Sequence, residues 1–413
     1  MSPAAPAAAP ATAPVVTGLG VVAPNGVNAE SYWQAVLDGK SGIDLITRFD
    51  STRYPVRLAG EVTGFVPTEH LPSRLVRQTS AMSHFGLIAA DQALADAGVD
   101  PADVPEYEMA VFTANATGGA EFGQRELQNL WSKGPDSVGA YMSVAWFYAA
   151  TTGQISIRHG MRGSCGVVVT EQAGSLDAVG QARRALRTRA RLAVAGGSDS
   201  SLSPSALVAQ LPAGRLTTAG DPAHGYRPFH PEADGYVPAE GGAMLILETP
   251  EAARERGARP YGRITGYRAT FDPPPGAGRP DNLAAAALGA LAEAGLDPAD
   301  IGLVIADAGG LPDSDRREAA ALARIFGPRG VPVTVPKALT GRLYAGGPSL
   351  DVVAALLSIR DSVIPPTVGV EEPAPRYEID LVVGEARPAS LDHVLVLARG
   401  HGGFNAAVVV SGP

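Results

Sequence analysis

The sequence predicts an α/β fold made of two duplicated halves. The dozen residues ALADAGVDPADV at 93–104 recur as ALAEAGLDPADI at 290–301, about half of the 413-residue chain later. Each copy ends a helical pattern at a glycine, passes an Asp-Pro turn and enters an apolar strand. A strand, turn and helix around residue 172 are mirrored by 331–359. Repeated order of elements indicates a duplicated unit, so we expect two sheets with helices packed between them.

The elements follow from the apolar patterns in chain order. Residues 15–22 predict a strand that runs into a tight turn of a close-packed sheet, with Gly18 and Gly20 in the turn. We expect helices over 31–38 and 80–97, the second capped by Gly98, and then a strand over 108–113. The second half adds strands over 243–248, 262–267, 302–307 and 331–335 and a helix over 349–359.

Length and composition predict two halves with a large shared core. Chains beyond about 250–300 residues usually divide, and 45% hydrophobic with 18% charged residues suits a well-filled interior. We expect an N-terminal half at 14–252 and a C-terminal half at 258–411. The Ala/Pro-rich residues 1–13 predict a disordered tail.

Charge and residue counts exclude several function classes. A net charge of −9 argues against general nucleic-acid binding. The single cysteine, Cys165, excludes an intramolecular disulfide and a multi-cysteine metal site, and the seven histidines show no zinc-ligand spacing, so we expect no bound metal. No apolar run reaches the length of a membrane span. We expect a soluble cytoplasmic protein.

The turn around Gln172 dominates the functional interpretation. Three valines at 167–169 predict the end of a buried strand, and a helical pattern follows from Gly174. Such a turn holds one side chain at a helix N-terminus, where a nucleophile or an oxyanion is stabilised. The side chain presented here is a carboxamide, which has no accessible pKa and cannot act as a nucleophile.

Three motifs then resemble the β-ketoacyl synthases of the thiolase fold. They are VTGLGVV at 16–22, PFHPEADGYVPAEGGA at 228–243 and GHGGFNAA at 400–407, and the resemblance covers about residues 14–411. It implies a layered α-β-α-β-α arrangement. Catalytic members carry one cysteine and two histidines, and this sequence departs from them at all three places. Gln172 replaces the cysteine, and Asp307 and Arg342 replace the histidines, while the preceding Lys337 is kept.

That combination resembles the chain length factor, or ketosynthase β subunit, of bacterial type II aromatic polyketide synthases. The segments TEQAG at 170–174 and 146–163 are typical of that subfamily. The resemblance implies no condensing activity of its own and a heterodimer with a catalytic ketosynthase α subunit in antibiotic biosynthesis. It also implies a substrate carried on the phosphopantetheine of an acyl carrier protein, with no cofactor bound to this chain.

The resemblance places a polyketide channel along the helix that follows residue 119. Ala120, Gly123 and Leu127 lie at i, i+3 and i+7 on one face of it, and Val144 and Ser205 line the same region by resemblance. All are small or medium, whereas short-chain members carry bulky residues there. We therefore expect a long product, a decaketide or longer. Close helix packing is the alternative explanation of the small residues.

Two interpretations stay open for several other residues. Gln172 either aids decarboxylation of a malonyl thioester to supply an acetyl starter, or only fills the old pocket. Asp307 and Arg342 either form a buried ion pair or both face solvent. Trp146, Phe147 and Tyr148 either contact the partner or are buried within this chain. The arginines of the helix after Gln172 suggest a carrier-protein docking patch or a solvated face: Arg183, Arg184, Arg187, Arg189 and Arg191. Cys165 is interpreted as a structural thiol, and a homodimeric scaffold is the remaining rival function.

Overall fold

The computed structural model describes residues 12–274 and 281–413. Its strands in the first half are β1 (Val15–Val22), β4 (Met109–Ala114), β5 (Cys165–Val168), β6 (Leu192–Ser200) and β7 (Glu240–Glu248). Those in the second half are β8 (Gly262–Phe271), β9 (Leu303–Ile305), β10 (Pro332–Thr334), β12 (Asp380–Leu381), β14 (His393–Gly400) and β15 (Phe404–Ser411). All eleven join one sheet in the order β12-β10-β9-β14-β15-β8-β1-β7-β6-β4-β5. Short pairs form between β2 (Ile43–Leu45) and β3 (Leu58–Gly60) and between β11 (Val363–Ile364) and β13 (Arg387–Pro388).

Strand directions repeat between the halves, as the predicted duplication requires. In the first half β4 runs parallel to β5 and β6, and β7 pairs antiparallel with β6 and β1. In the second half β9 runs parallel to β10 and β14, and β15 pairs antiparallel with β14 and β8. The halves meet where β1 pairs with β8 over two residues, Val15 with Arg263 and Val16 with Gly262.

Twelve helices lie within the described ranges. They are α1 (Ala29–Leu37), α2 (Ser73–Gln78), α3 (Ala81–Ala97), α4 (Ala120–Lys133), α5 (Met142–Ala145), α6 (Ala150–Arg158), α7 (Gly174–Leu186), α8 (Pro204–Gln210), α9 (Pro250–Glu255), α10 (Leu283–Ala294), α11 (Pro312–Phe326) and α12 (Gly347–Asp361). The two copies of the repeated dozen end α3 and α10. Each helix stops at a glycine in the left-handed conformation, Gly98 at φ 63° and Gly295 at φ 71°. None of these helices is long and apolar enough to span a bilayer.

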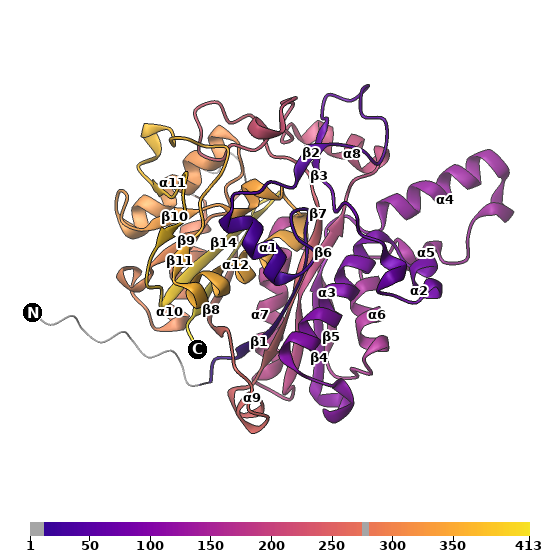
Figure 1. The fold of residues 1–413 in the computed structure, drawn as a ribbon, viewed down its shortest axis with the longest axis horizontal. Coiled ribbons are helices and arrows are strands. Elements are labelled where there is room, and N and C mark those ends of the chain that lie inside the picture. The colour runs from indigo at the N-terminus through magenta and orange to yellow at the C-terminus, as the bar shows by residue number, and fades with distance from the viewer. Residues whose placement is uncertain (1–11, 275–280) are drawn as a thin grey trace, which may run out of the picture.

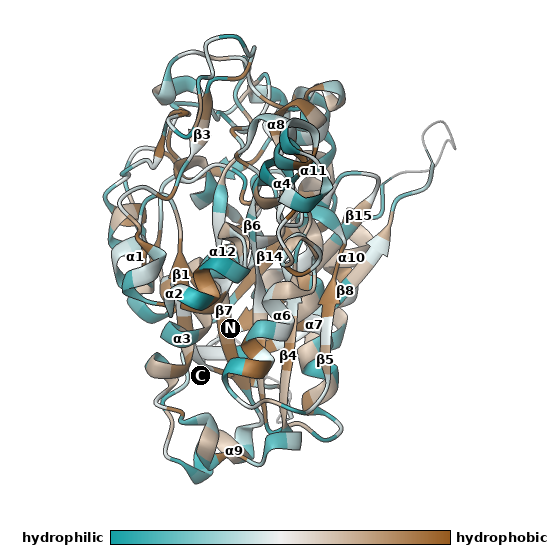
Figure 2. Cartoon of the chain, turned by 90° about the vertical axis from the view of Figure 1, so that its right-hand side faces the viewer, coloured by the Kyte–Doolittle hydropathy of each residue, from teal (hydrophilic) through white to brown (hydrophobic). Residues whose placement is uncertain are grey.

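The two parts of the sheet face each other across α7 and α12, which confirms the layered α-β-α-β-α thiolase fold (Figure 1). Alternate residues of β14 show the layering. Val394 and Val396 join the central cluster with α7 and α12, whereas Leu395 and Leu397 join the outer cluster beneath α10 and α11. On the other side α3 covers β1, β6 and β7. Figure 2 shows the hydrophobic colour concentrated in these buried strands.

Two sequence predictions about strands were wrong. Gly18 and Gly20 lie inside β1 rather than in a turn, and a Cβ there would stand 2.1 Å and 1.8 Å from carbonyl oxygens of α3. The absent side chains let helix and strand approach closely. The valines at 167–169 do not end a buried strand, because β5 is an edge strand and Val169 is 48% exposed. Cys165 is the exposed first residue of β5.

The boundaries of the halves stay a prediction. Of the predicted tail, residues 1–11 lie outside the described ranges. Ala13, which was assigned to that tail, is buried, and the carbonyl of Pro14 accepts a hydrogen bond from Ile264. The described structure therefore includes the last residue of the segment that was assigned to the tail.

Candidate functional site

The predicted nucleophile turn is present with its side chain directed inward. β5 ends at Val168, a short turn covers Glu171–Ala173, and α7 starts at Gly174. Gln172 is 3% exposed. The carboxamide therefore occupies the interior position at the start of α7 that the sequence predicted for it.

Arg342 joins the three positions at which the catalytic groups are missing. Its Nε donates to Oε1 of Gln172, and its Nη2 donates to Oδ1 of Asp307 at 2.7 Å. Its Nη1 donates to the Asp307 carbonyl at 2.8 Å. The guanidinium lies over the Tyr236 ring, 5.3 Å from its centroid, and the Gln172 amide donates to the Tyr236 hydroxyl at 3.2 Å. Of the two interpretations of the Asp307–Arg342 charges, the structure supports the buried ion pair.

Both members of this pair are held in their charged forms. Burial alone would raise the pKa of Asp307, but the charge and hydrogen bonds of Arg342 outweigh it and hold that pKa below its usual range. Burial likewise opposes the charge of Arg342, and Asp307 raises its pKa in compensation. A charged, fully hydrogen-bonded pair thus fills the pocket where a thiolate and two imidazoles would have to stand for condensation.

Further buried charged residues surround the Asp307–Arg342 pair, and the sequence did not predict their contacts. Lys337 pairs with Asp351 on α12 at 2.8 Å. The Glu318 carboxylate on α11 accepts the backbone N–H groups of Asp307 at 2.8 Å and Ala308 at 2.7 Å. The Arg399 backbone donates to Asp307 at 2.8 Å. Acidic residues at helical spacing usually lie on a solvated face, so no signal in α11 marked Glu318 as a buried ligand of this loop.

Glu318 is expected to make stability fall as pH rises from about 4.5 to about 7. Burial and the negative charge of Asp307 raise its pKa from 4.5 to about 7, although the two N–H groups and Arg399 oppose the rise. The folded state therefore binds this proton more tightly than the unfolded chain. The resulting stability is complete below about pH 4.5 and is lost by about pH 7, a difference of about 3 kcal/mol. Denaturant unfolding of wild type and Glu318→Gln at pH 5.5 and 8 measures this pH-dependent contribution to the free energy of unfolding.

The wild-type stability minus that of Glu318→Gln should be larger at pH 5.5 than at pH 8. Glu385→Gln, at an exposed carboxylate, serves as the control. An equal difference at both pH values for Glu318→Gln would contradict the prediction.

A groove along α4 collects most of the predicted channel residues. A hollow of about 910 Å³ lies between α4, α5 and α8. Its lining includes Ala120, Gly123, Leu127 and Ser205. Val144 does not line it; it is exposed on α5, and Met142 and Trp146 face the groove instead. A Cβ on Gly123 would approach the Trp146 ring to 2.9 Å, so the small residue at 123 is matched to that indole.

Two contacts tie this groove to the filled pocket. Gln210, which lines the groove, accepts a hydrogen bond from the Tyr344 hydroxyl, just before α12. The buried Asp199 carboxylate accepts the backbone N–H groups of Ala116, Thr117 and Ala345 at 2.9, 3.1 and 3.1 Å. The start of α4 is therefore fixed relative to the central helices, and the groove has a rigid inner end.

The aromatic cluster lies beside the groove and faces outward. Trp146 and Phe147 are exposed, and Tyr148 packs against both, with ring centroids 6.1 Å apart in each pair. Burial within this chain is therefore excluded for the first two.

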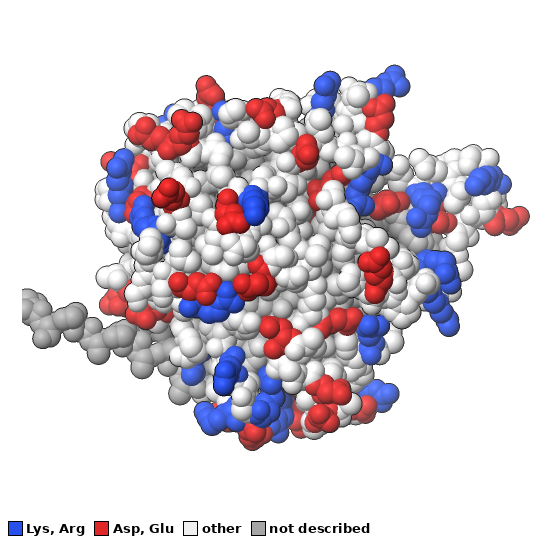
Figure 3. Space-filling model, in the orientation of Figure 1, with Lys and Arg blue, Asp and Glu red and all other residues white. Residues whose placement is uncertain are grey.

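The arginines after Gln172 do not form a single solvated face, because one of them is buried, and a carrier-protein docking role for the exposed ones stays a prediction. Arg183 is buried and pairs with Glu293 at 2.9 Å, and Arg187 pairs with the same carboxylate at 2.8 Å. Arg191 pairs with Glu255. On the face shown in Figure 3, acidic and basic side chains intermingle without a large area of one sign.

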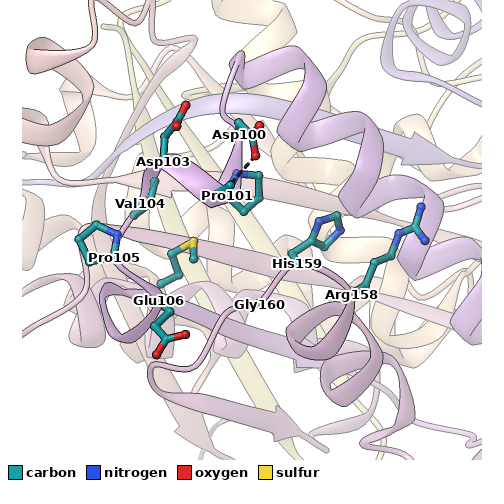
Figure 4. A pocket seen from close by; sticks show the side chains of 11 residues that line it. Asp100, Pro101, Asp103, Val104, Pro105, Glu106, Arg158, His159 and Gly160 are labelled. Carbon is teal, nitrogen blue, oxygen red and sulfur yellow. Dashed lines mark hydrogen bonds between the residues drawn. The ribbon is translucent and has the colours of Figure 1, made fainter.

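A second hollow, of about 640 Å³, contains none of the predicted site residues (Figure 4). It lies between the turn at 100–106 and the end of α6. Its Arg158 and His159 pair with Asp91 at 2.8 and 2.9 Å. The Arg158–Asp91 ion pair and the contact from His159 hold α6 against α3. In the part of the chain that the structure describes, no cluster of three histidine, cysteine or acidic side chains could hold a metal.

Comparisons with known proteins agree with this geometry. A sequence model of the β-ketoacyl synthase N-terminal domain matches residues 13–253, and one of the C-terminal domain matches residues 261–371. The chain belongs to the β-ketoacyl synthase family. Within that family it falls among the ketosynthase β subunits of bacterial type II polyketide synthases, the chain-length-factor type.

Relatives of this β-ketoacyl synthase chain share nearly its full length. The tetracenomycin polyketide synthase ketoacyl synthase beta subunit of Streptomyces glaucescens is 58% identical, with 96% of this chain and 97% of the relative covered. The actinorhodin polyketide putative beta-ketoacyl synthase 2 of Streptomyces coelicolor is 53% identical, with 96% and 98% covered. Among solved structures, the ishigamide ketosynthase/chain length factor has a TM-score of 0.89 at 26% identity, covering 97% of this chain and 99% of that one.

Proposed function

We propose that this subunit contributes no condensing chemistry, pairs with a catalytic ketosynthase α subunit and bounds the length of the polyketide that the pair makes. The observation that carries the proposal is the closed network of Gln172, Asp307 and Arg342. A condensing site needs a thiolate nucleophile and donors free to meet the carbonyl. Here the carboxamide is held at both ends, by Arg342 and by Tyr236. A decarboxylase role for Gln172 would need that amide to be free.

The proposed partner surface lies at the right-hand end of the molecule in Figure 1, where α4 projects beyond the body. Trp131 on this helix is 83% exposed, and Phe147 and Trp146 beside it are exposed as well. Nearby, β5 is an edge strand with exposed Val169. Exposed aromatics and an uncovered edge strand mark a protein interface.

The groove on α4 supports the length-setting part of the proposal. It opens on the same side as these exposed aromatics, so a partner covering them would turn it into a closed channel. Ala120 and Gly123 in its lining have small side chains, which leaves room for a long chain. We therefore infer a long product, a decaketide or longer. The growing chain reaches this channel on the phosphopantetheine of an acyl carrier protein. A solved relative with a TM-score of 0.86 is a type II ketosynthase in complex with its acyl-carrier protein.

Reconstitution with a ketosynthase α subunit tests the proposal. The two chains should co-purify as a heterodimer and, with carrier protein and malonyl thioester, make a polyketide. This subunit alone should neither condense nor release carbon dioxide from malonyl-carrier protein above background. Carbon dioxide release that disappears in Gln172→Ala would favour the decarboxylase instead, and a stable homodimer that ignores the α subunit would favour the scaffold.

Trp131→Asp is expected to weaken assembly with the α subunit by at least tenfold in Kd. Truncating a buried aromatic residue at an interface typically costs about 2 kcal/mol or more of binding free energy. A carboxylate in its place adds a desolvation cost. Analytical ultracentrifugation of the two purified chains measures the Kd. Leu288→Asp is the matched control, because Leu288 is 43% exposed on α10, at the far side of the fold. Equal affinity of Trp131→Asp and wild type would place the interface elsewhere.

A further inference from the structure

Two backbone N–H groups converge on one carboxylate oxygen beside the filled pocket. The N–H of Gln172 donates to Oε2 of Glu171 at 2.7 Å. The N–H of His401, in the turn between β14 and β15, donates to the same oxygen at 2.7 Å. These donors come from turns about 230 positions apart in the chain. Two N–H groups aimed at one oxygen form the arrangement that stabilises a developing oxyanion.

The residue that fills this arrangement is held in a backbone conformation that its side chain does not favour. Glu171 has φ 52°, in the left-handed region that glycine adopts without strain. Its side chain is half-buried. The β14–β15 turn packs closely against it, since a Cβ added to Gly400 would lie 3.2 Å from the Glu171 Cβ. The two charge-assisted hydrogen bonds are what hold the carboxylate in this position.

We propose that Glu171 is an internal occupant of an oxyanion hole, and that it excludes the carbonyl oxygen of an acyl thioester from this subunit. Arg342 and Asp307 fill the place of the reacting groups, whereas Glu171 occupies the place of the reacting oxygen. The inference deepens the proposed function, on which it rests, by naming the residue that blocks binding of a thioester or another small anion at this turn.

Removing the carboxylate should turn the N–H pair into an anion site. The test uses crystals of the full-length subunit, alone or in the heterodimer, soaked in bromide, whose anomalous signal locates the ion. Glu171→Gly removes the carboxylate and suits the left-handed φ, and Glu171→Ala is the second variant in case the glycine loosens the turn. Bromide should appear between the N–H groups of Gln172 and His401 in the variants and be absent there in wild type.

The chain offers a matched control in Glu378. It too is a glutamate with a left-handed backbone, at φ 49°, but it is exposed, and its side chain makes no hydrogen bond among the described residues. Glu378→Gly should leave the melting temperature of the purified subunit unchanged or raised, because glycine relieves the backbone. Glu171→Gly should lower it, because two charge-assisted hydrogen bonds are lost.

Three outcomes would overturn the inference. They are bromide at the N–H pair in wild type, no bromide there in either Glu171 variant, or equal melting shifts in Glu171→Gly and Glu378→Gly. None of these readouts uses product length. A heterodimer that fails to form, or whose product ignores the groove residues, therefore counts against the proposed function and not against Glu171 as the occupant of the site.

Discussion

Asp307→Ala is expected to destabilise the subunit by about 3–5 kcal/mol. The side chain is buried and accepts hydrogen bonds from Arg342 and from the Arg399 backbone. Its removal leaves the guanidinium of Arg342 charged in a site where water cannot reach it. The remaining acceptors, the carbonyls of residues 307 and 308 and the Gln172 amide, satisfy its hydrogen bonds but not its charge.

Urea unfolding at pH 7 measures this loss, and two further variants make it specific. Asp380→Ala breaks an exposed pair with Arg387 of the same length, 2.7 Å, and should cost about 1 kcal/mol or less. The double variant Asp307→Ala/Arg342→Met removes both charges and should be more stable than Asp307→Ala alone, because no uncompensated charge remains. If Asp307→Ala cost no more than Asp380→Ala, the pair would not act as a closed unit in the core.

The duplication could be predicted from the sequence because its signal is local. The Gly98 and Gly295 caps and the Asp-Pro turns after them are short-range features, and each ends a helix in the predicted way. The position of Gln172 was equally predictable, since a strand that turns into a helix fixes one side chain at the helix start. The pairing of Asp307 with Arg342 remained open, because the sequence does not say whether two distant charges meet.

Features that depend on what a surface faces were not predictable. The valines at 167–169 have the composition of a buried strand, but β5 lies at the edge of the sheet. An apolar strand that a partner covers and one that its own chain covers have the same pattern. Glu171 carries no signal at all, because its function as a ligand depends on a turn at His401, far along the chain. Val144 falls outside the groove lining for a similar reason: Met142 and Trp146, two positions to either side of it, are the residues that line the groove.

Gly123→Thr and Ala120→Phe are each expected to shorten the major polyketide by at least one extension unit. Gly123 faces Trp146 so closely that a Cβ would stand 2.9 Å from the indole. A threonine must therefore push the indole into the groove or enter the groove itself. Ala120 lines the same hollow one turn earlier. In a close-packed wall the added volume cannot be absorbed without loss of space.

Mass spectrometry of the products of the reconstituted pair measures the shift, with the heterodimer content of each variant checked by gel filtration. Lys133→Phe places the same phenyl ring at the end of α4, outside the groove lining, and should leave the product unchanged. Under the proposed function the catalytic groups belong to the partner, so the product should shorten while turnover stays close to that of the wild-type pair. An intact Gly123→Thr heterodimer that makes the wild-type product would show that Trp146 yields outward, and that the groove on α4 does not bound the chain.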